Sequence, residues 1–510
     1  MNNYAFAYKN GRLEPFKVSI VALAASLCIA VPTSSGASIE TIFDQTASKL
    51  EASRDGKGID NLSGKIAWGI AYELDALIDM YLATGKEKYL AKFVPLCDRV
   101  VAARADKMGQ LDFKGRLCAG WLTNGHYTQG EPVVLLSAHG QPSIEIQTCA
   151  HSYNNETTIQ VIPDGEEKFS LHVTGHSSTP AKSSLRFDGL TVHTAEERVN
   201  PKPGQIGYTR VRRLGNEPPR SCGPFTPPTA RIVLHGHHTG RIVTPMARFA
   251  ALVKARPQLS SHADAAARFL RCAEEAAMEM ETLWRTEGDF GYLIFERNTP
   301  FWCDGAPEPY NCLSASGVMY LALHDATAKG LYLEHATRLA RLTKAGLRLQ
   351  DDGTLFMYYW WGKPLEGWQP TDNISVNTPL LKPKKTPEDT SHLQHTIRFM
   401  AECQERGIVF DVADLQRMAA TFNKKIYREQ GGNGLVAGFI DGTDGSHAPG
   451  KFNNMVYGWL KLVRVDRSVY AKCRSMYEQR SREAAESHVL YGWAMLAQAE
   501  KLLQVGQVQQ

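Results

Sequence analysis

The 510-residue sequence has no marked excess of charge of either sign, because 57 Lys and Arg residues stand against 53 Asp and Glu residues, for a net charge of +4. It also has no long run of Lys or Arg. Nucleic-acid-binding proteins concentrate positive charge in a patch or stripe, so this composition argues against a nucleic-acid partner. Apolar residues make up 43% and charged residues 22%, which excludes a disordered, collagen-like or coiled-coil chain.

Several motifs with a known chemical role are also missing. The sequence has no phosphate-binding P-loop, no HExxH metal motif and no GxSxG nucleophile motif. None of the ten cysteines forms a CxxC pair, which argues against a zinc ribbon. The sequence therefore predicts neither a metal ion nor a cofactor.

Only one apolar run, Val18–Pro32, is long enough to be considered as a membrane-targeting or membrane-embedded segment. It follows three basic residues and leads into small residues, which is the pattern of a secretory signal peptide. The run is shorter than the ~20 residues that a membrane-spanning helix needs. We expect residues 1–37 to be removed, the protein to be secreted or periplasmic, and no membrane contact after removal. A retained anchor and a buried helix are the alternatives.

An exported protein can form disulfides. Cys303 and Cys312 bracket a short loop and are the best candidate pair. Two buried thiols are the alternative interpretation of these residues.

Helical hairpins are predicted on both sides of a central segment. Apolar residues recur every three to four positions over 62–105, with a break at 83–85. The same pattern returns at 326–333, and a weaker copy runs through 459–470. Repeated hairpins stack because none can bury its apolar face alone. Further helices are expected at 261–284, 391–404, 412–425 and 483–503, and one beginning at Thr244 with Pro245 in its first turn.

The segment 128–235 has a different pattern. Short runs with alternating apolar residues, separated by turn signals, predict strands at 143–147, 158–162, 168–173, 190–192 and 231–234. This spacing favours a β-sandwich. The predicted domains are therefore a signal peptide (1–37), a first helical part (38–127), a β-rich insert (128–235) and the main helical part (236–510).

Two clusters could carry chemistry, and the first lies at the exit from the insert. His235, His237, His238 and Arg241 share a glycine-rich turn. His237 or His238 could act as a base or a ligand, and Arg241 could bind a carboxylate through two hydrogen bonds. A solvated polar loop is the alternative. A metal site is disfavoured because no carboxylate lies at ligand spacing.

The second cluster runs from Pro387 to His395. Ser391 and Gln394 fit a capping box, which predicts that a helix starts here with His392 in its first turn. The positive end of the helix dipole should keep His392 neutral, as a general base must be. In the alternative interpretation, Glu388 and Asp389 cap the helix and His392 is structural.

Aromatic residues are dense at 292–310 and 356–361. Sugars stack their apolar faces on aromatic rings, so Trp302, Trp360 and Trp361 indicate a carbohydrate ligand. The alternative is that these rings belong to the core. Asn311 begins a helix after a Pro-rich loop, where it could bind a sugar carboxylate or cap the helix.

Four stretches resemble a known family. They are Tyr81–Leu90 (YLATGKEKYL), Pro245–Ala250 (PMARFA), Tyr310-Asn311, and Glu388–His392 (EDTSH) followed by Glu405–Phe410 (ERGIVF). Together they are similar to bacterial α/α-toroid carbohydrate-active proteins, including polysaccharide lyases that act on alginate and glucuronan. The resemblance covers the helical body in patches. It implies a mainly α fold, an (α/α) toroid or incomplete barrel of helical hairpins, here with an inserted β-sandwich-like domain.

The resemblance also implies β-elimination on an acidic polysaccharide or oligosaccharide. In such lyases one group neutralises the C5 carboxylate, a His or Tyr removes the C5 proton, and a Tyr protonates the leaving oxygen. The candidates are Asn311 and Arg241 for neutralisation, His392 or His238 as base, and Tyr358 or Tyr310 as acid. His237, Trp302, Trp360, Trp361 and Asp389 are expected to contact the substrate.

Two other functions remain open from the sequence. A glycoside hydrolase would place two carboxyl groups beside the scissile bond. Its candidates are Asp351, Asp352, Glu388, Asp389, Asp441 and Asp444. A non-catalytic glycan-binding protein would use the insert and the aromatic loops only to hold sugar.

Overall fold

The computed structural model describes residues 5–9, 12–16, 37–149, 157–176, 182–200, 209–228, 234–480 and 484–508. It separates into two compact units, residues 1–38 and residues 39–510. In the first unit β1 (Ala5–Lys9) pairs antiparallel with β2 (Arg12–Phe16). The apolar run Val18–Pro32, which predicts a signal peptide, lies outside the described residues. Among the helices that the structure describes, none has the length and apolar character needed to cross a membrane.

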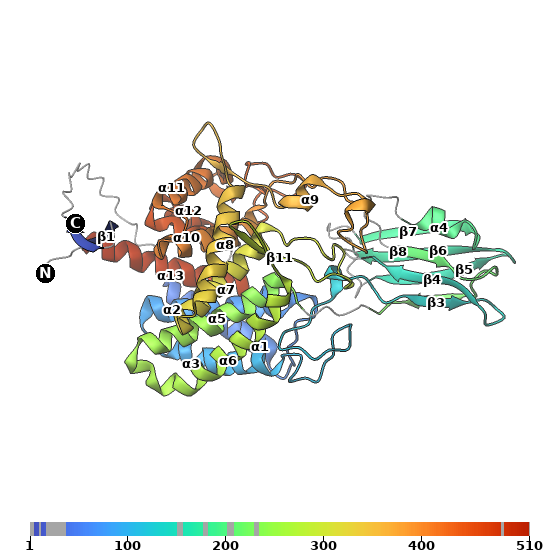
Figure 1. Cartoon of the computed structure of the whole chain (residues 1–510), viewed down its shortest axis with the longest axis horizontal. Helices are drawn as coiled ribbons and strands as arrows, with labels where there is room; N and C mark the ends of the chain where they lie inside the picture. The colour runs from blue at the N-terminus through green and yellow to red at the C-terminus, as the bar shows by residue number, and fades with distance from the viewer. Residues whose placement is uncertain are drawn as a thin grey trace. The chain divides into compact units, whose positions relative to one another are not determined.

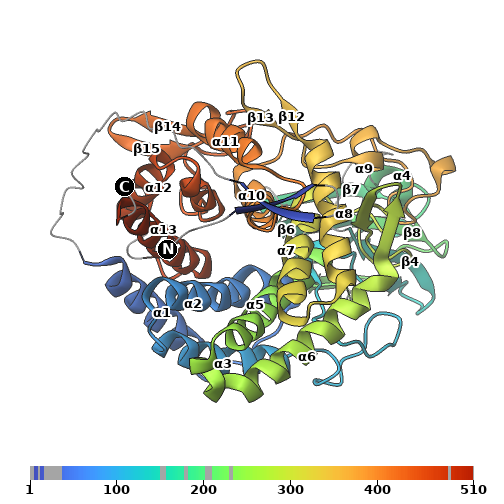
Figure 2. The same ribbon diagram turned by 60° about the vertical axis from the view of Figure 1, so that its left-hand side comes forward.

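The helices of residues 39–510 form two concentric layers (Figure 2). In the inner layer each helix packs against the next, and the last packs against the first, so that a ring closes. This arrangement confirms the predicted mainly α toroid of helical hairpins. The inner layer is α2 (Ala71–Thr84), α5 (Gly236–Ala255), α7 (Tyr310–Thr327), α10 (Thr390–Glu405), the 3₁₀ helix η9 (Gly458–Arg464) and α13 (Ser487–Val508). The outer layer is α1 (Ile39–Arg54), α3 (Lys88–Ala102), α6 (Ala263–Glu279), α8 (Gly330–Gly346), α11 (Val412–Thr421) and α12 (Ser468–Arg480).

The sequence patterns of the two layers differ because their surroundings differ. The outer helix α3 buries Tyr89, Phe93, Cys97 and Val100, one stripe at helical spacing, and leaves its other face polar. The inner helix α2 is buried along residues 71–81, because neighbours surround it on every side. The repeated breaks also match in the structure. Gly85 and Ala328 both end an inner helix in the left-handed conformation.

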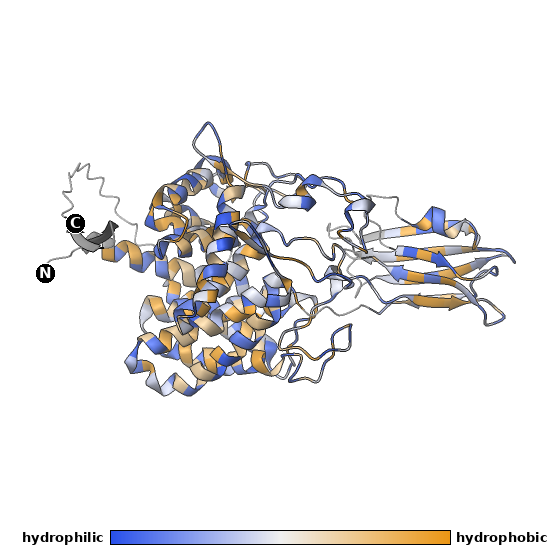
Figure 3. Cartoon of the chain, in the orientation of Figure 1, coloured by the Kyte–Doolittle hydropathy of each residue, from blue (hydrophilic) through white to orange (hydrophobic). Residues whose placement is uncertain are grey.

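The insert consists of two antiparallel sheets with a common core, as a β-sandwich requires (Figure 1). Apolar and polar residues alternate along its strands, which gives each sheet one apolar face (Figure 3). Of the strand predicted at 190–192, only Leu190 lies in a strand, as the last residue of β7. Of the strand predicted at 231–234, residues 231–233 lie outside the described residues. One sheet has the order β3 (Val133–Leu136), β4 (Pro142–Thr148), β8 (Thr209–Arg213); the other has the order β7 (Lys182–Leu190), β6 (Lys168–His176), β5 (Thr158–Asp164), β9 (Cys222–Phe225).

Two sequence predictions about local structure are wrong. The helix expected to start at Thr244 is α5, which already begins at Gly236 and passes through Pro245. The Thr244 hydroxyl, just before the proline, donates to the Gly240 carbonyl one turn earlier at 2.6 Å. Cys303 and Cys312 are buried free thiols rather than a disulfide.

Gly240 explains why α5 continues through the sequence that suggested a turn. A Cβ atom at this position would lie 2.8–2.9 Å from backbone atoms of Ala315 and Ser316 in α7. The missing side chain therefore lets the two inner helices pack at close range, and this packing outweighs the low helix propensity of glycine.

We expect Gly240→Ala to lower the free energy of unfolding by about 1–3 kcal/mol, because the backbone of α7 must move to admit the methyl group. Urea unfolding followed by circular dichroism measures the change. Gly330→Ala is the control, since a Cβ atom at Gly330 meets no atom within 4 Å. A Gly240→Ala protein as stable as the Gly330→Ala protein would contradict the close packing of α5 on α7.

Candidate functional site

The N-terminal ends of the inner helices meet at one end of the ring. Trp68, in the π-helical turn η2 (Ile66–Ile70) before α2, contacts residues at the start of both α5 and α10. The Gly236 amide at the start of α5 donates to Glu308 Oε1 at 2.7 Å, just before α7. Because consecutive inner helices run in the same direction, side chains far apart in the sequence converge here.

Imidazole rings surround Trp68, and we call Trp68, His235, His237, His238, His392 and His395 the histidine centre. The indole ring stacks on His237 with ring centroids 4.3 Å apart, and it lies 5.9 Å from His392 and 6.1 Å from His395. His235 stacks on His238 at 4.4 Å. The two sequence clusters, at 235–241 and 387–395, therefore form one site.

Burial keeps two of these imidazoles neutral. It lowers the pKa of His237 well below the usual value, and the nearby His395 and His235 act in the same direction. Burial likewise lowers the pKa of His395, with a further contribution from the Arg241 guanidinium. Arg241 lies over the ring of Tyr72 at 4.0 Å, and the Tyr72 hydroxyl is 3.4 Å from His395 Nε2.

His392 differs from the other imidazoles because it is paired with a carboxylate. Asp389 is the N-cap of α10, and its Oδ1 accepts the amide N–H groups of Ser391 and His392, each at 3.0 Å. Asp389 Oδ2 bonds His392 Nδ1. Burial disfavours a charged imidazole, but the Asp389 charge outweighs it and raises the pKa of His392. Burial also opposes ionisation of Asp389, yet His392 and Ser391 lower the pKa of this carboxyl to about 2.

These contacts correct two predictions about α10. The helix is capped by Asp389 and not by a Ser391–Gln394 box, since the Gln394 side chain donates to the Ser391 carbonyl instead. His392 is not held neutral by the helix dipole, because the Asp389 charge next to it is the stronger influence.

The pKa of Glu388 is shifted in the opposite direction to that of its neighbour Asp389. Its side chain is fully buried, and neither carboxyl oxygen has a hydrogen-bond partner among the described residues. Burial, reinforced by the Asp389 charge, raises the pKa of Glu388 well above the usual value. One oxygen of Glu388 lies within 4.8 Å of an oxygen of Asp389. Two adjacent carboxyl groups therefore differ in how strongly they hold a proton.

The pairing of His392 with Asp389 gives a direct prediction. In the Asp389→Asn protein the imidazole stays buried but loses its anion, so we expect the pKa of His392 to fall below that of the wild type. Titration followed by NMR of the imidazole protons measures it. Asp372→Asn, which removes a cap from a short helix elsewhere, is the control and should leave the titration unchanged. An unchanged pKa in Asp389→Asn would show that Asp389 does not set the charge of His392.

The structure places other predicted site residues outside the histidine centre. Tyr358 packs on Phe356 and under the Arg348 guanidinium, and Tyr310 lies against Gly346 and Trp361. Trp302 and Trp360 pack in an apolar cluster that also includes Tyr127 and Tyr359. Trp361 packs on Tyr292 and donates to the Glu308 carbonyl at 2.9 Å.

Asn311 lies in the first turn of α7, one residue before Cys312. Its side chain is buried, and its Oδ1 has no hydrogen-bond partner in the described parts of the chain. Among the hydrolase candidates, Asp352 pairs with Lys425 and Asp444 with Arg428 in exposed ion pairs. Of those candidates, Glu388 and Asp389 are the two placed beside the histidine centre.

Sequence reasoning missed several residues of the site. Tyr359, not Tyr358, faces His392, with ring centroids 5.7 Å apart. Tyr127 accepts a hydrogen bond from the Trp68 indole at 2.6 Å. The alternation of side chains in the extended segment 356–361 could have indicated that only one of two adjacent tyrosines faces the centre. Trp68 and Glu308 carry no local signal, because their place depends on how the helices pack.

No protein-family model matches the sequence, and no curated protein sequence matches it either. Solved structures do resemble it. An inactive variant of an α-1,6-mannanase of glycoside hydrolase family 76 from Salegentibacter sp. HEL1_6, in complex with α-1,6-mannotetrose, is 12% identical over 92% of this chain and 100% of that one, with a TM-score of 0.44. A family 76 α-mannanase from Bacteroides thetaiotaomicron is 11% identical over 47% and 59% of the chains, with a TM-score of 0.29. A D-mannose isomerase is 12% identical over 54% and 74%, with a TM-score of 0.31.

The comparisons correct the predicted reaction. The sequence predicts a polysaccharide lyase, but the toroids to which the chain is similar include α-mannanases, which are glycoside hydrolases. The lyase prediction is therefore corrected, and the roles of the individual site residues stay predictions.

Proposed function

We propose that the protein is a glycoside hydrolase in which Glu388 is the proton donor and Asp389 the ionised carboxylate. The observation that carries the proposal is that these two adjacent carboxyl groups have oxygens within 4.8 Å of each other and surroundings that shift their pKa values in opposite directions. Glycoside hydrolysis requires one carboxyl group that holds its proton at working pH and one that does not. Here burial raises the pKa of Glu388, and the charge of His392, together with hydrogen bonds from His392 and Ser391, lowers the pKa of Asp389.

The reaction follows from these two states. The Glu388 side chain is buried in the free protein and must come into contact with the glycosidic oxygen of the bound glycan. It donates its proton there as the bond from that oxygen to the anomeric carbon breaks. The Asp389 carboxylate attacks the anomeric carbon and forms a glycosyl ester. Water then cleaves the ester, and its proton passes to Glu388, which restores both groups.

The distance between the carboxyl groups selects a stereochemical outcome. Retaining hydrolases have carboxyl groups about 5–5.5 Å apart, and inverting hydrolases need about 6.5–9.5 Å to admit a water molecule. One oxygen of Glu388 and one of Asp389 lie within 4.8 Å of each other, which favours the shorter separation. We therefore expect retention of anomeric configuration.

The surroundings of this pair suit a sugar. Trp68, Tyr127, Tyr359 and His392 are partly exposed at the site, while His237 and His395 are buried behind them. Partly exposed rings offer flat apolar faces for stacking, and the imidazoles offer hydrogen bonds to hydroxyl groups. This supports a glycan as substrate. The mannan-acting neighbours agree with a glycan, and the acidic character predicted from the sequence stays a prediction.

The test is a panel of α-mannans, other neutral glycans and polyuronates incubated with the full chain. We expect reducing ends to appear without the ultraviolet absorbance of an unsaturated sugar, and NMR of the first products to show retained configuration. Glycan binding without turnover on any substrate, or turnover by a protein with both Glu388→Gln and Asp389→Asn, would overturn the proposal.

We also propose export of the protein, supported by the apolar run near the N-terminus. Expression of the full chain in a bacterial host, followed by N-terminal sequencing of the periplasmic fraction, tests it. A mature protein that begins close to residue 38 is expected, and an uncleaved cytoplasmic protein would contradict export.

A further inference from the structure

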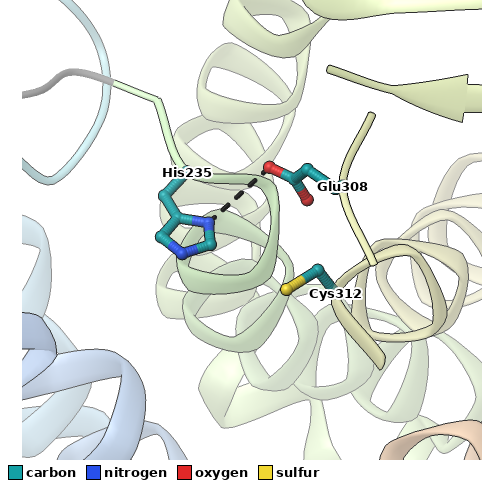
Figure 4. Close-up of side chains that lie close together, drawn as sticks. All are labelled: His235, Glu308 and Cys312. Carbon is teal, nitrogen blue, oxygen red and sulfur yellow. Dashed lines mark ion pairs between the residues drawn. The ribbon is translucent and has the colours of Figure 1, made fainter. Parts of the chain in front are cut away.

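Three side chains of types that bind metal ions converge where α5 and α7 begin (Figure 4). His235 is the N-cap of α5, Glu308 lies two residues before α7, and Cys312 lies in the first turn of α7. One ligand atom of each lies within 4.8 Å of one atom of each of the others. None of the three residues is more than 6% exposed.

We propose that His235, Glu308 and Cys312 form a binding site for a divalent transition-metal ion, with Zn²⁺ as the best match. A nitrogen, an oxygen and a sulfur ligand are the set from which zinc sites are built, and three protein ligands leave a fourth position for water or another ligand. Mg²⁺ and Ca²⁺ prefer oxygen ligands only, so the thiol argues against them.

The spacing of the ligand atoms fits a tetrahedral ion. Bonds from zinc of about 2.0–2.3 Å place neighbouring ligand atoms about 3.3–3.8 Å apart. His235 Nδ1 already lies 3.6 Å from Oε1 of the Glu308 carboxylate, so the ring and the carboxylate are close enough for the unpartnered Oε2 to share an ion with Nδ1. The other ligand atoms lie within 4.8 Å, so shifts of about 1 Å would complete the geometry.

Unsatisfied polar atoms point to the same site. His235 Nδ1 and Glu308 Oε2 are buried and have no hydrogen-bond partner among the described residues. A buried polar atom without a partner costs about 1–3 kcal/mol, which a bound ion would offset. The other carboxylate oxygen, Glu308 Oε1, is held by the Gly236 amide, and such outer contacts orient metal ligands.

A second group, Glu388, Asp389 and His392, also has ligand atoms within 4.8 Å of one another. In this group both oxygens of the Asp389 carboxylate already form hydrogen bonds. Asp389 Oδ1 accepts from the Ser391 and His392 amides, and Oδ2 bonds His392 Nδ1. A metal ion would have to displace those bonds, so the observations favour the His235–Glu308–Cys312 group.

An ion at this position would connect the entry to α5 with the entry to α7, next to the histidine centre. The proposal goes beyond hydrolysis and does not depend on it, because metal content can be measured without any substrate. The sequence argued against a metal because no carboxylate lies near the histidines along the chain. Glu308 reaches His235 only through the packing of α5 on α7.

The test uses the full chain without a histidine tag, stripped with a chelator and kept reduced. Zn²⁺ is added and bound metal is counted by mass spectrometry of the element, and Co²⁺ is added in parallel to detect a thiolate-to-cobalt absorption band. We expect a single ion per chain, the cobalt band, and a higher Tm with metal.

Two variants and one control make the result specific. Cys312→Ser should abolish the cobalt band, and Glu308→Gln, which can still accept from Gly236, should weaken binding by more than the roughly 10–100-fold typical of outer-shell changes. Cys303→Ser removes another buried thiol and should leave binding unchanged. Absence of bound metal in the folded wild type, or unchanged binding in Glu308→Gln with native circular dichroism, would overturn the proposal. Neither result would affect the proposed hydrolase.

Discussion

Replacing Glu388 with glutamine is expected to remove turnover and at the same time make the protein more stable. If Glu388 is the proton donor, its loss should lower kcat by roughly 10²–10⁴-fold, the usual contribution of general acid catalysis. Glutamine keeps the shape of the side chain but cannot ionise. Comparing Glu388→Gln with the wild type therefore separates the effect of losing the proton from any effect on packing.

The stability gain follows from the raised pKa of Glu388. Its ordinary pKa is 4.5, and burial raises it well above that value in the folded protein. The unfolded chain then loses this proton at a lower pH than the folded protein, so the wild type loses stability as pH rises above 4.5. Glutamine has no such loss. We expect the difference in Tm between Glu388→Gln and wild type to grow from pH 4.5 towards neutral pH.

Two comparisons separate a catalytic from a structural role. Glu73 is another buried glutamate with a raised pKa, but it lies in the pair with Arg54 and not beside Asp389. Glu73→Gln should therefore gain stability relative to wild type as pH rises, by the same linkage, but keep kcat. Aryl glycosides with good leaving groups need little protonation, so Glu388→Gln should retain more of its activity on them than on natural glycans. Equal losses on both substrates would argue against Glu388 as the acid, and full activity on glycans would exclude it.

The helical architecture is the part that the sequence predicts well. The stripe in α3 and the breaks at Gly85 and Ala328 are local features, and local sequence is enough to recognise a hairpin and its repetition. The start of α5 is the exception. Its first two turns contain glycine and histidine, so local propensity suggests a turn, whereas the packing of Gly240 against α7 makes them helical.

The candidate site could be predicted only in part, for the same reason. Both histidine clusters are visible as unusual local composition, and the structure brings them together around Trp68. Their partners are not visible, because Trp68 and Glu308 join them through the register of the inner helices. The charge of His392 depended on one atom-level contact with Asp389, which a helix-dipole argument does not include.

Beneath the histidine centre lies a buried ion cluster, and the second large effect is expected there. Asp75 on α2 is fully buried and pairs with Arg248 at 2.5 Å, Arg398 at 2.6 Å and Arg241 at 3.4 Å. These guanidiniums come from α5 and α10, so one carboxylate links three inner helices. Burial opposes its ionisation, but the three positive charges outweigh burial and lower the pKa of Asp75.

We expect Asp75→Asn to lower the free energy of unfolding by about 3–5 kcal/mol, because it leaves buried positive charge without its counter-ion. In this variant Arg248 still pairs with Asp79, and Arg398 still pairs with Glu402. Arg241 is therefore the guanidinium most affected by the loss of the Asp75 charge. Since Arg241 lies over Tyr72 beside His395, we expect turnover to fall as well. Glu51→Gln, which breaks an exposed pair with Lys92, is the control and should cost less than about 1 kcal/mol.

The pH dependence gives a second measurement of the same cluster. Because the pKa of Asp75 is lower in the folded than in the unfolded protein, its stabilising contribution is present above the unfolded pKa and is lost as pH falls towards the folded value. The wild type should therefore lose more stability on acidification than Asp75→Asn, and the two unfolding curves should approach each other at low pH. Parallel curves, or a neutral-pH loss no larger than that of Glu51→Gln, would show that Asp75 does not hold α2, α5 and α10 together.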